Sequence, residues 1–173
     1  MSIGFNSGGK HKTSENKKPT KAYTSWKNLM KHCGSDDNDS SVCDAWLDYQ
    51  SFAEWYYGHN IYRDDYRLTK GLLVDSNVYS TDTCHLLPRA FVDLRLDSLP
   101  KLEGYLPTRG GKYIARIAVE GKTIQLGSFD SPSEALEAYA LAKEGQVIAV
   151  TREYRDIIDS DVYNALINWK FPV

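Results

Sequence analysis

Basic and polar side chains recur along residues 109–125, interleaved with apolar ones. In residues 112–119 the alternation has a period of two, which places one set of side chains on each face of a β-strand. The set that lies opposite the apolar one is Lys112, Ile114, Arg116 and Ala118. An arginine on an exposed strand pair can bond a guanine edge in the major groove of DNA. The pattern therefore permits nucleic-acid contact, and the alternative is an ordinary solvated sheet face.

Thiol and imidazole groups are the side chains with which this chain could hold zinc. The candidates are His32, Cys33, Cys43, Cys84 and His85. No Cys-x-x-Cys pair is present, and the spacing of the cysteines is loose for a zinc site. We therefore favour buried thiols that pack as small apolar groups, and zinc is not favoured as a cofactor. Three cysteines, an odd number, are typical of a reducing compartment.

Three strands and a helix would position the basic side chains. The alternation and the glycine turns predict strands over 104–108, 112–119 and 122–129. A helix should begin after Ser131, because Ser131 and Glu134 form a capping box and Pro132 suits the first helical position. Residues 104–150 are therefore predicted to form a three-stranded sheet with one helix packed on it.

This stretch resembles the AP2 DNA-binding domain. The matching residues are Gly104-Tyr105, Lys112 to Ile117, Gly121-Lys122, Leu126 to Asp130, Glu134-Ala135 and Ala138-Tyr139. Tyr113 stands where the family usually has tryptophan. The resemblance implies that the sheet, not the helix, lies in the major groove of double-stranded DNA. The residues it would turn toward DNA are Arg109, Lys112, Arg116, Lys122, Thr123 and Gln125.

The N-terminal half has a different character. Residues 1–21 are polar and basic, which predicts a disordered arm that either contacts the DNA backbone or is simply solvated. Helical spacing of apolar residues follows in 24–33 and 42–58, and we expect their aromatic side chains to form a core. Further on, a strand over 72–74, a second over 78–80 and a helix after Pro88 would make a ββα unit.

Residues 22–96 resemble the HNH endonuclease family found in phages, whose members often carry an AP2 module. The matching segments are Trp26 with Leu29-Met30, Val42 to Asp44, Phe52 to Tyr56, Tyr66 to Leu68, Leu72 to Val74, Val78 to Ser80, Cys84 and Leu87-Pro88. The resemblance implies a ββα unit that holds one divalent metal, with a base that activates water against a phosphodiester.

The residues that should bind this metal depart from the family pattern. Thr69 and Gly71 replace two carboxylates of a Leu-Asp-Lys-Asp run, and Val92 stands where an asparagine is usual. A displaced site remains an alternative, with Asp65, His85 and Asp93 as catalytic candidates. Of these, Asp65 and His85 would hold the metal, and Mg²⁺ or Mn²⁺ would be the cofactor of an active enzyme.

Composition limits the classes that remain. The chain has 173 residues and a formal net charge of −2, so any DNA affinity must come from local basic surfaces. No apolar run reaches membrane-spanning length and the N-terminus lacks a secretory apolar core, so we expect no membrane partner and a cytoplasmic location. For a phage-encoded protein, this would be the cytoplasm of the bacterial host.

Taken together, the sequence predicts an α+β fold with four parts. These are a disordered basic arm (1–21), an HNH-like domain with a degenerate ββα unit (22–100), an AP2-like domain (101–150) and a C-terminal helix (151–173). The expected function is DNA binding with a lost or altered nuclease site. The alternatives are an active homing-type endonuclease with a displaced site, and a protein-interaction module that binds a host protein through the acidic loop 34–41. The sequence does not fix the oligomeric state.

Overall fold

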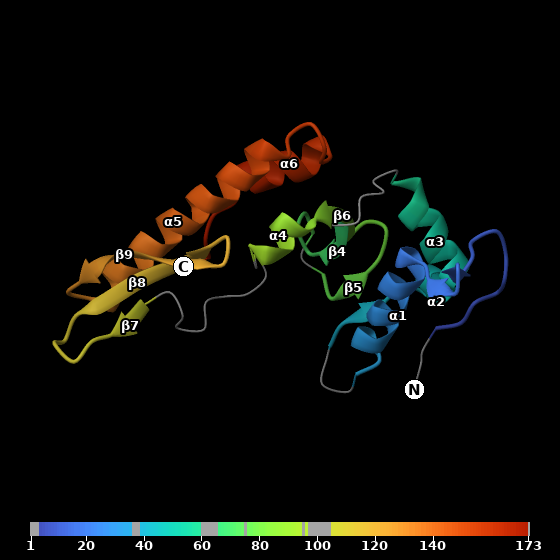
Figure 1. Ribbon diagram of the computed structural model, residues 1–173, viewed down its shortest axis with the longest axis horizontal. Coiled ribbons are helices and arrows are strands. Elements are labelled where there is room, and N and C mark those ends of the chain that lie inside the picture. The colour runs from blue at the N-terminus through green and yellow to red at the C-terminus, as the bar shows by residue number, and fades with distance from the viewer. Residues whose placement is uncertain are drawn as a thin grey trace. The chain divides into compact units, whose positions relative to one another are not determined.

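The computed structural model describes residues 4–35, 39–59, 66–74, 76–94, 96 and 105–172. The fold is α+β, as the sequence predicts. The chain divides into two compact units, Met1–Val92 (unit 1) and Asp93–Val173 (unit 2). Figure 1 shows the elements of both units. Within the described residues, no helix has the length and apolar character needed to span a membrane.

Three helices carry the core of unit 1. They are α1 (Lys21–Cys33), α2 (Asp44–Leu47) and α3 (Tyr49–Gly58). The side chains of Trp46, Tyr49 and Phe52 are almost completely buried between them. The indole N–H of Trp26 donates to the carbonyl of Trp46 at 2.8 Å, which satisfies the polar end of a buried ring. The prediction that these aromatic residues form a core is confirmed.

The N-terminal segment corrects the prediction of a disordered arm. Residues 4–20 are held along α2 and α3, beginning with the N–H of Phe5, which donates to the carbonyl of Leu47 at 2.9 Å. Asp48 accepts from the N–H and hydroxyl of Ser7, and Gln50 exchanges hydrogen bonds with the backbone of His11. Composition cannot reveal this order, because the groups that satisfy the polar backbone lie about forty positions away.

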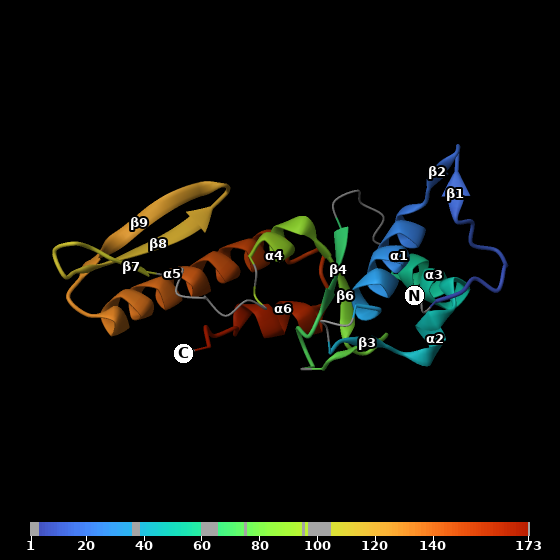
Figure 2. The same cartoon turned by 90° about the horizontal axis from the view of Figure 1, so that it is seen from below.

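Two short strands complete this segment. β1 (Ser14–Glu15) pairs with β2 (Lys18–Pro19) in an antiparallel hairpin. Figure 2 shows this hairpin at the start of α1.

A ββα unit is present, but its strands differ from those predicted. β4 (Tyr66–Lys70) pairs antiparallel with β6 (Cys84–Pro88), and α4 (Arg89–Asp93) follows. Residues 72–74 form no strand; Leu73 and Val74 are 41% and 48% exposed in the connection between β4 and β6. β5 (Val78–Tyr79) pairs instead with β3 (Ser41–Val42), in parallel.

Unit 2 contains the predicted sheet. Its strands are β7 (Tyr105–Pro107), β8 (Tyr113–Val119) and β9 (Lys122–Phe129), antiparallel in the order β7-β8-β9. α5 (Pro132–Glu153) lies along one face of this sheet (Figure 2). Its predicted capping box is confirmed: the N–H of Glu134 donates to Ser131, and the Glu134 carboxylate accepts from the N–H of Ser131.

The C-terminal helix packs on α5, a question that the sequence left open. α6 (Ser160–Ile167) buries Val162 and Leu166, while α5 buries Val147 and Thr151. Beyond α6, Glu144 of α5 accepts from the ammonium group of Lys170 at 2.7 Å and from the N–H of Phe171 at 3.1 Å. These contacts hold the end of the described chain against the helix.

Candidate nucleic-acid interface

The sheet of unit 2 has one buried and one open face. On β8, Ala115 and Ile117 are 0% and 5% exposed, because α5 covers their side. Arg116 and Ala118, which alternate with them, are exposed. The open face is therefore the one that carries the arginine, as the period of two predicts.

The pairing of β8 with β9 adds two polar side chains to the open face. Arg116 lies opposite Gln125, and Ala118 lies opposite Thr123. Directly paired residues project to the same face of an antiparallel sheet, about 5 Å apart at Cβ. A register shift between Ala115 and Arg116 creates this alignment, since it leaves one extra residue on β9. An arginine and an amide thus lie side by side at the middle of an exposed strand pair.

Lys122 lies on the other face by register. It pairs with Val119, whose side chain shares the face of Ala115 and Ile117. The structure therefore does not bring Lys122 together with Arg116, Thr123 and Gln125, although the resemblance grouped all four. The sequence contains the signal, because Lys122 and Thr123 are neighbours in one strand and neighbours point to opposite faces.

Arg109 lies in the tight connection between β7 and β8. The carbonyl of Lys112 accepts from the N–H of Thr108 at 2.7 Å, and the Thr108 hydroxyl accepts from the N–H of Lys112 at 3.1 Å. Gly111 has a φ of +77°, which a glycine adopts without strain. The turn holds Arg109 exposed at the end of the sheet, separate from the Arg116–Gln125 pair.

Lys112 is engaged in an ion pair. Its Nζ lies 3.0 Å from Oδ1 of Asp130, and the two side chains are 54% and 82% exposed. Pairs this exposed contribute little to stability, so a phosphate could replace the carboxylate at small cost. Residues 105–130 contain four basic and two acidic side chains, whereas residues 131–173 contain more acidic than basic ones. The strands and turns are the basic part of unit 2.

Apolar side chains also occupy the open face, which sequence reasoning did not single out. Leu106 of β7 pairs with Ile114 of β8, and Leu106 is 48% exposed. Apolar groups beside a base-reading arginine can contact the methyl group of thymine. The alternation already put Ile114 on this face, but the register that adds Leu106 is visible only in the folded chain.

In unit 1, the paired strands β4 and β6 place His85 directly opposite Thr69. The hydroxyl oxygen of Thr69 is buried and has no hydrogen-bond partner in the described part of the chain. Gly71 has a φ of +78°, so its backbone conformation disfavours any side chain. The positions of the two missing carboxylates are thus a buried hydroxyl and a strained turn.

The other proposed catalytic residues are not assembled around His85. Asp65 lies outside the described residues. Asp93 is exposed at the end of α4 and belongs to unit 2 by its contacts, and Val92 before it is 41% exposed. Across the ranges that the structure describes, no group of three or more His, Cys, Asp or Glu side chains is placed to hold a metal ion.

The three cysteines are free thiols in unit 1. Burial raises the pKa of the Cys84 thiol, and it raises that of the partly buried Cys33 thiol as well. A raised pKa keeps a thiol protonated at neutral pH, which disfavours both metal binding and nucleophilic attack. Cys84 packs with the aromatic core, in agreement with its interpretation as a small apolar group.

Comparisons with known proteins add no identification: no protein-family model, curated protein or solved structure matches this chain.

Proposed function

We propose that this chain is a DNA-binding protein of HNH–AP2 architecture, of the kind that phages encode, and that the open face of its sheet enters the major groove. The observation that carries the proposal is the register pair of Arg116 and Gln125 on an exposed face. Arginine can bond guanine and glutamine can bond adenine, each with two hydrogen bonds. Leu106 and Ile114 would lie against the bases beside this pair, and Arg109 and Lys112 would reach phosphates.

In this proposal the HNH-like unit recognises or supports rather than cuts. Metal-assisted cleavage of a phosphodiester needs oxygen or nitrogen ligands with negative charge or a free lone pair. Gly71 and Val92 supply none, and the hydroxyl of Thr69 is a weak ligand beside the carboxylate that it replaces. The role would be recognition of DNA, or interference with another DNA-processing protein during infection of a bacterium.

Equilibrium binding to a short duplex tests the proposal. Fluorescence anisotropy with a labelled duplex of about 20 base pairs should give saturable binding that weakens as salt rises, with a log–log slope of about −0.9 for each phosphate contacted. A minor-groove ligand should leave the affinity unchanged. Absence of binding even at low salt would remove the DNA proposal and favour the protein-interaction alternative.

An active endonuclease with a displaced site is the second candidate. The observation that favours it is the retained order of β4, β6 and α4, with His85 held on the paired strands. Supercoiled plasmid incubated with Mg²⁺ or Mn²⁺ distinguishes the two candidates. Nicking that is lost in a chain carrying Asp65→Ala and His85→Ala would establish cleavage. Intact plasmid with DNA still retained on a gel would support the binding protein.

A further inference from the structure

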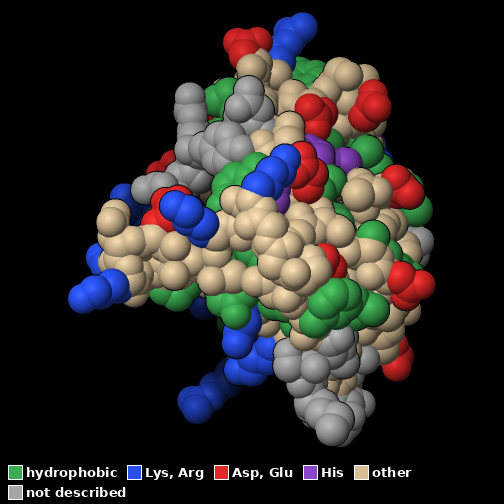
Figure 3. All heavy atoms as spheres, turned by 90° about the vertical axis from the view of Figure 1, so that its right-hand side faces the viewer, with side chains coloured by type: hydrophobic (Ala, Val, Ile, Leu, Met, Phe, Trp, Pro, Cys, Tyr) green, Lys and Arg blue, Asp and Glu red, His purple; other side chains and the backbone are tan. Residues whose placement is uncertain are grey.

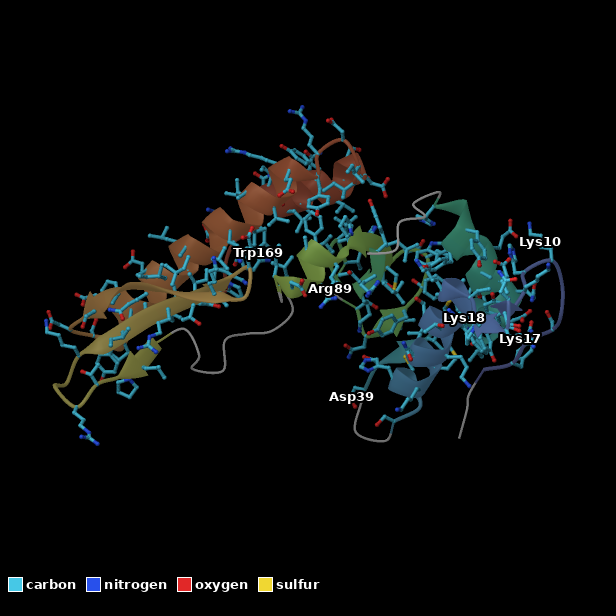
Figure 4. The ribbon with its side chains drawn as sticks, viewed as in Figure 1. Lys10, Lys17, Lys18, Asp39, Arg89 and Trp169 are labelled. Carbon is cyan, nitrogen blue, oxygen red and sulfur yellow. The ribbon has the colours of Figure 1, made fainter. Side chains whose placement is uncertain are left out.

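The β1–β2 hairpin presents a basic surface in unit 1 that the sheet does not explain. Lys12, Lys17 and Lys18 are exposed, and none of the three forms an ion pair with an acidic side chain in the described chain. Lys17 and Lys18 are labelled at the N-terminal end of the unit in Figure 4. The space-filling view of this end shows lysine and arginine side chains standing out singly from the surface (Figure 3).

The turn at the tip of the hairpin places a lysine in a strained conformation. Asn16 and Lys17 have φ values of +50° and +63°. A two-residue hairpin turn with both φ values positive favours glycine at its second position, since a side chain there is crowded by the backbone. Lysine at this position is a local cost to folding. Strain of this kind at an exposed tip points to a function for the side chain.

The base of the hairpin is fixed to the core. The hydroxyl of Tyr49, a completely buried residue, donates to the carbonyl of Lys12 at 2.8 Å. The N–H of Thr20 donates to the carbonyl of Thr13 at 2.9 Å, and the Thr20 hydroxyl accepts from the N–H of Tyr23, which caps α1. The hairpin is therefore a positioned projection, so its lysines lose little freedom when they bind.

We propose that the β1–β2 hairpin contacts the phosphate backbone of DNA through Lys12, Lys17 and Lys18. Residues 10–21 contain five lysines and one glutamate in a chain whose net charge is −2, so the positive charge is concentrated there. The lysine ammonium group is a compact point charge that suits phosphate oxygens rather than base edges. The hairpin would add affinity without sequence preference. This inference rests on the proposed DNA-binding function.

The test uses the full chain and a duplex of roughly 20 base pairs, with affinity measured from about 50 to about 300 mM NaCl. Replacing Lys17 by glycine removes a charge and relieves the positive φ. The variant Lys17→Gly should therefore melt at a higher temperature yet bind DNA more weakly, a combination that a purely structural lysine would not give. Adding Lys18→Gln should lower the magnitude of the salt slope further, by about 0.9 for each lost contact.

Two control variants make the result specific. Lys27→Gln removes the same charge from an exposed position on α1 and should keep the wild-type slope. Lys17→Arg keeps the charge and should keep the affinity.

Three outcomes would overturn the inference. A Lys17→Gly, Lys18→Gln chain with wild-type affinity and slope would remove the hairpin contact, while weaker binding by Arg116→Ala in the same series would leave the sheet proposal standing. A Lys17→Gly chain that melts lower and binds more weakly would assign the lysine to folding. A wild-type chain that binds no duplex would remove both proposals.

Discussion

The two main hairpins of this chain, β4–β6 in unit 1 and β8–β9 in unit 2, have the same antiparallel pairing but opposite surroundings. Leu86 and Leu87 of β6 are 4% and 2% exposed, and the Thr69 hydroxyl on β4 is buried. On β9, four successive residues from Lys122 to Gln125 are exposed, and Ile124 keeps 46% of its surface. One hairpin is part of a core and the other is a platform.

The difference shows where recognition can take place. A paired strand that is covered on both faces contributes packing, and the polar groups left inside it must be satisfied or paid for. A strand pair covered on one face by α5 is rigid and yet offers its other face to a ligand. We therefore assign recognition to the β8–β9 platform and scaffolding to β4–β6.

Leucine-to-alanine substitution should separate the two hairpins most strongly. Leu87→Ala removes a buried side chain from β6 and should lower the free energy of unfolding by about 2–5 kcal/mol. Leu106→Ala, beside the open face, should change it by less than about 0.5 kcal/mol. Urea unfolding followed by circular dichroism measures both. Equal losses would mean that the sheet face is covered in solution.

Loss of the α5 cap should loosen the platform alone. Ser131→Ala removes the acceptor for the N–H of Glu134 and should cost about 1 kcal/mol. Hydrogen exchange should then become faster for the amides of β8 and stay unchanged for those of β4. Faster exchange in both hairpins would show that the two units do not unfold separately.

The smallest expected effect is a pH dependence in unit 2. The hydrogen bond from the Lys170 ammonium, with a second from the N–H of Phe171, lowers the pKa of Glu144. Because the folded pKa lies below the unfolded one, this stabilisation is complete above pH values of about 4.3 and is lost as the pH falls through the folded pKa. The difference in melting temperature between wild type and Glu144→Gln should therefore shrink on acidification. A constant difference would contradict the ion pair.

The sequence predicted unit 2 better than unit 1, because the signals in unit 2 are local. The capping box of Ser131 and Glu134 lies within one turn, and the alternation of β8 is read directly from residues 113–119. The register that joins Arg116 to Gln125 depends on a bulge, which the alternation alone does not reveal.

In unit 1 the decisive contacts join distant residues. The apolar run 72–74 suggested a strand, whereas the paired strands begin with the more polar Tyr66–Lys70 and return only at Cys84–Pro88. The N-terminal segment is polar enough to suggest disorder, but Asp48 and Gln50 supply its hydrogen-bond partners. Neither contact has a signature in a local window.

A matched pair of charge deletions on the two faces of β8–β9 tests the central claim most directly. Arg116→Ala and Lys122→Ala each remove one positive charge from an exposed position, but the register puts them on opposite faces of the sheet. Duplex affinity should fall by about 1–3 kcal/mol for Arg116→Ala, the range for loss of an arginine that bonds a base edge twice. It should fall much less for Lys122→Ala. Equal losses, or a larger loss for Lys122→Ala, would contradict the assignment of the open face to DNA.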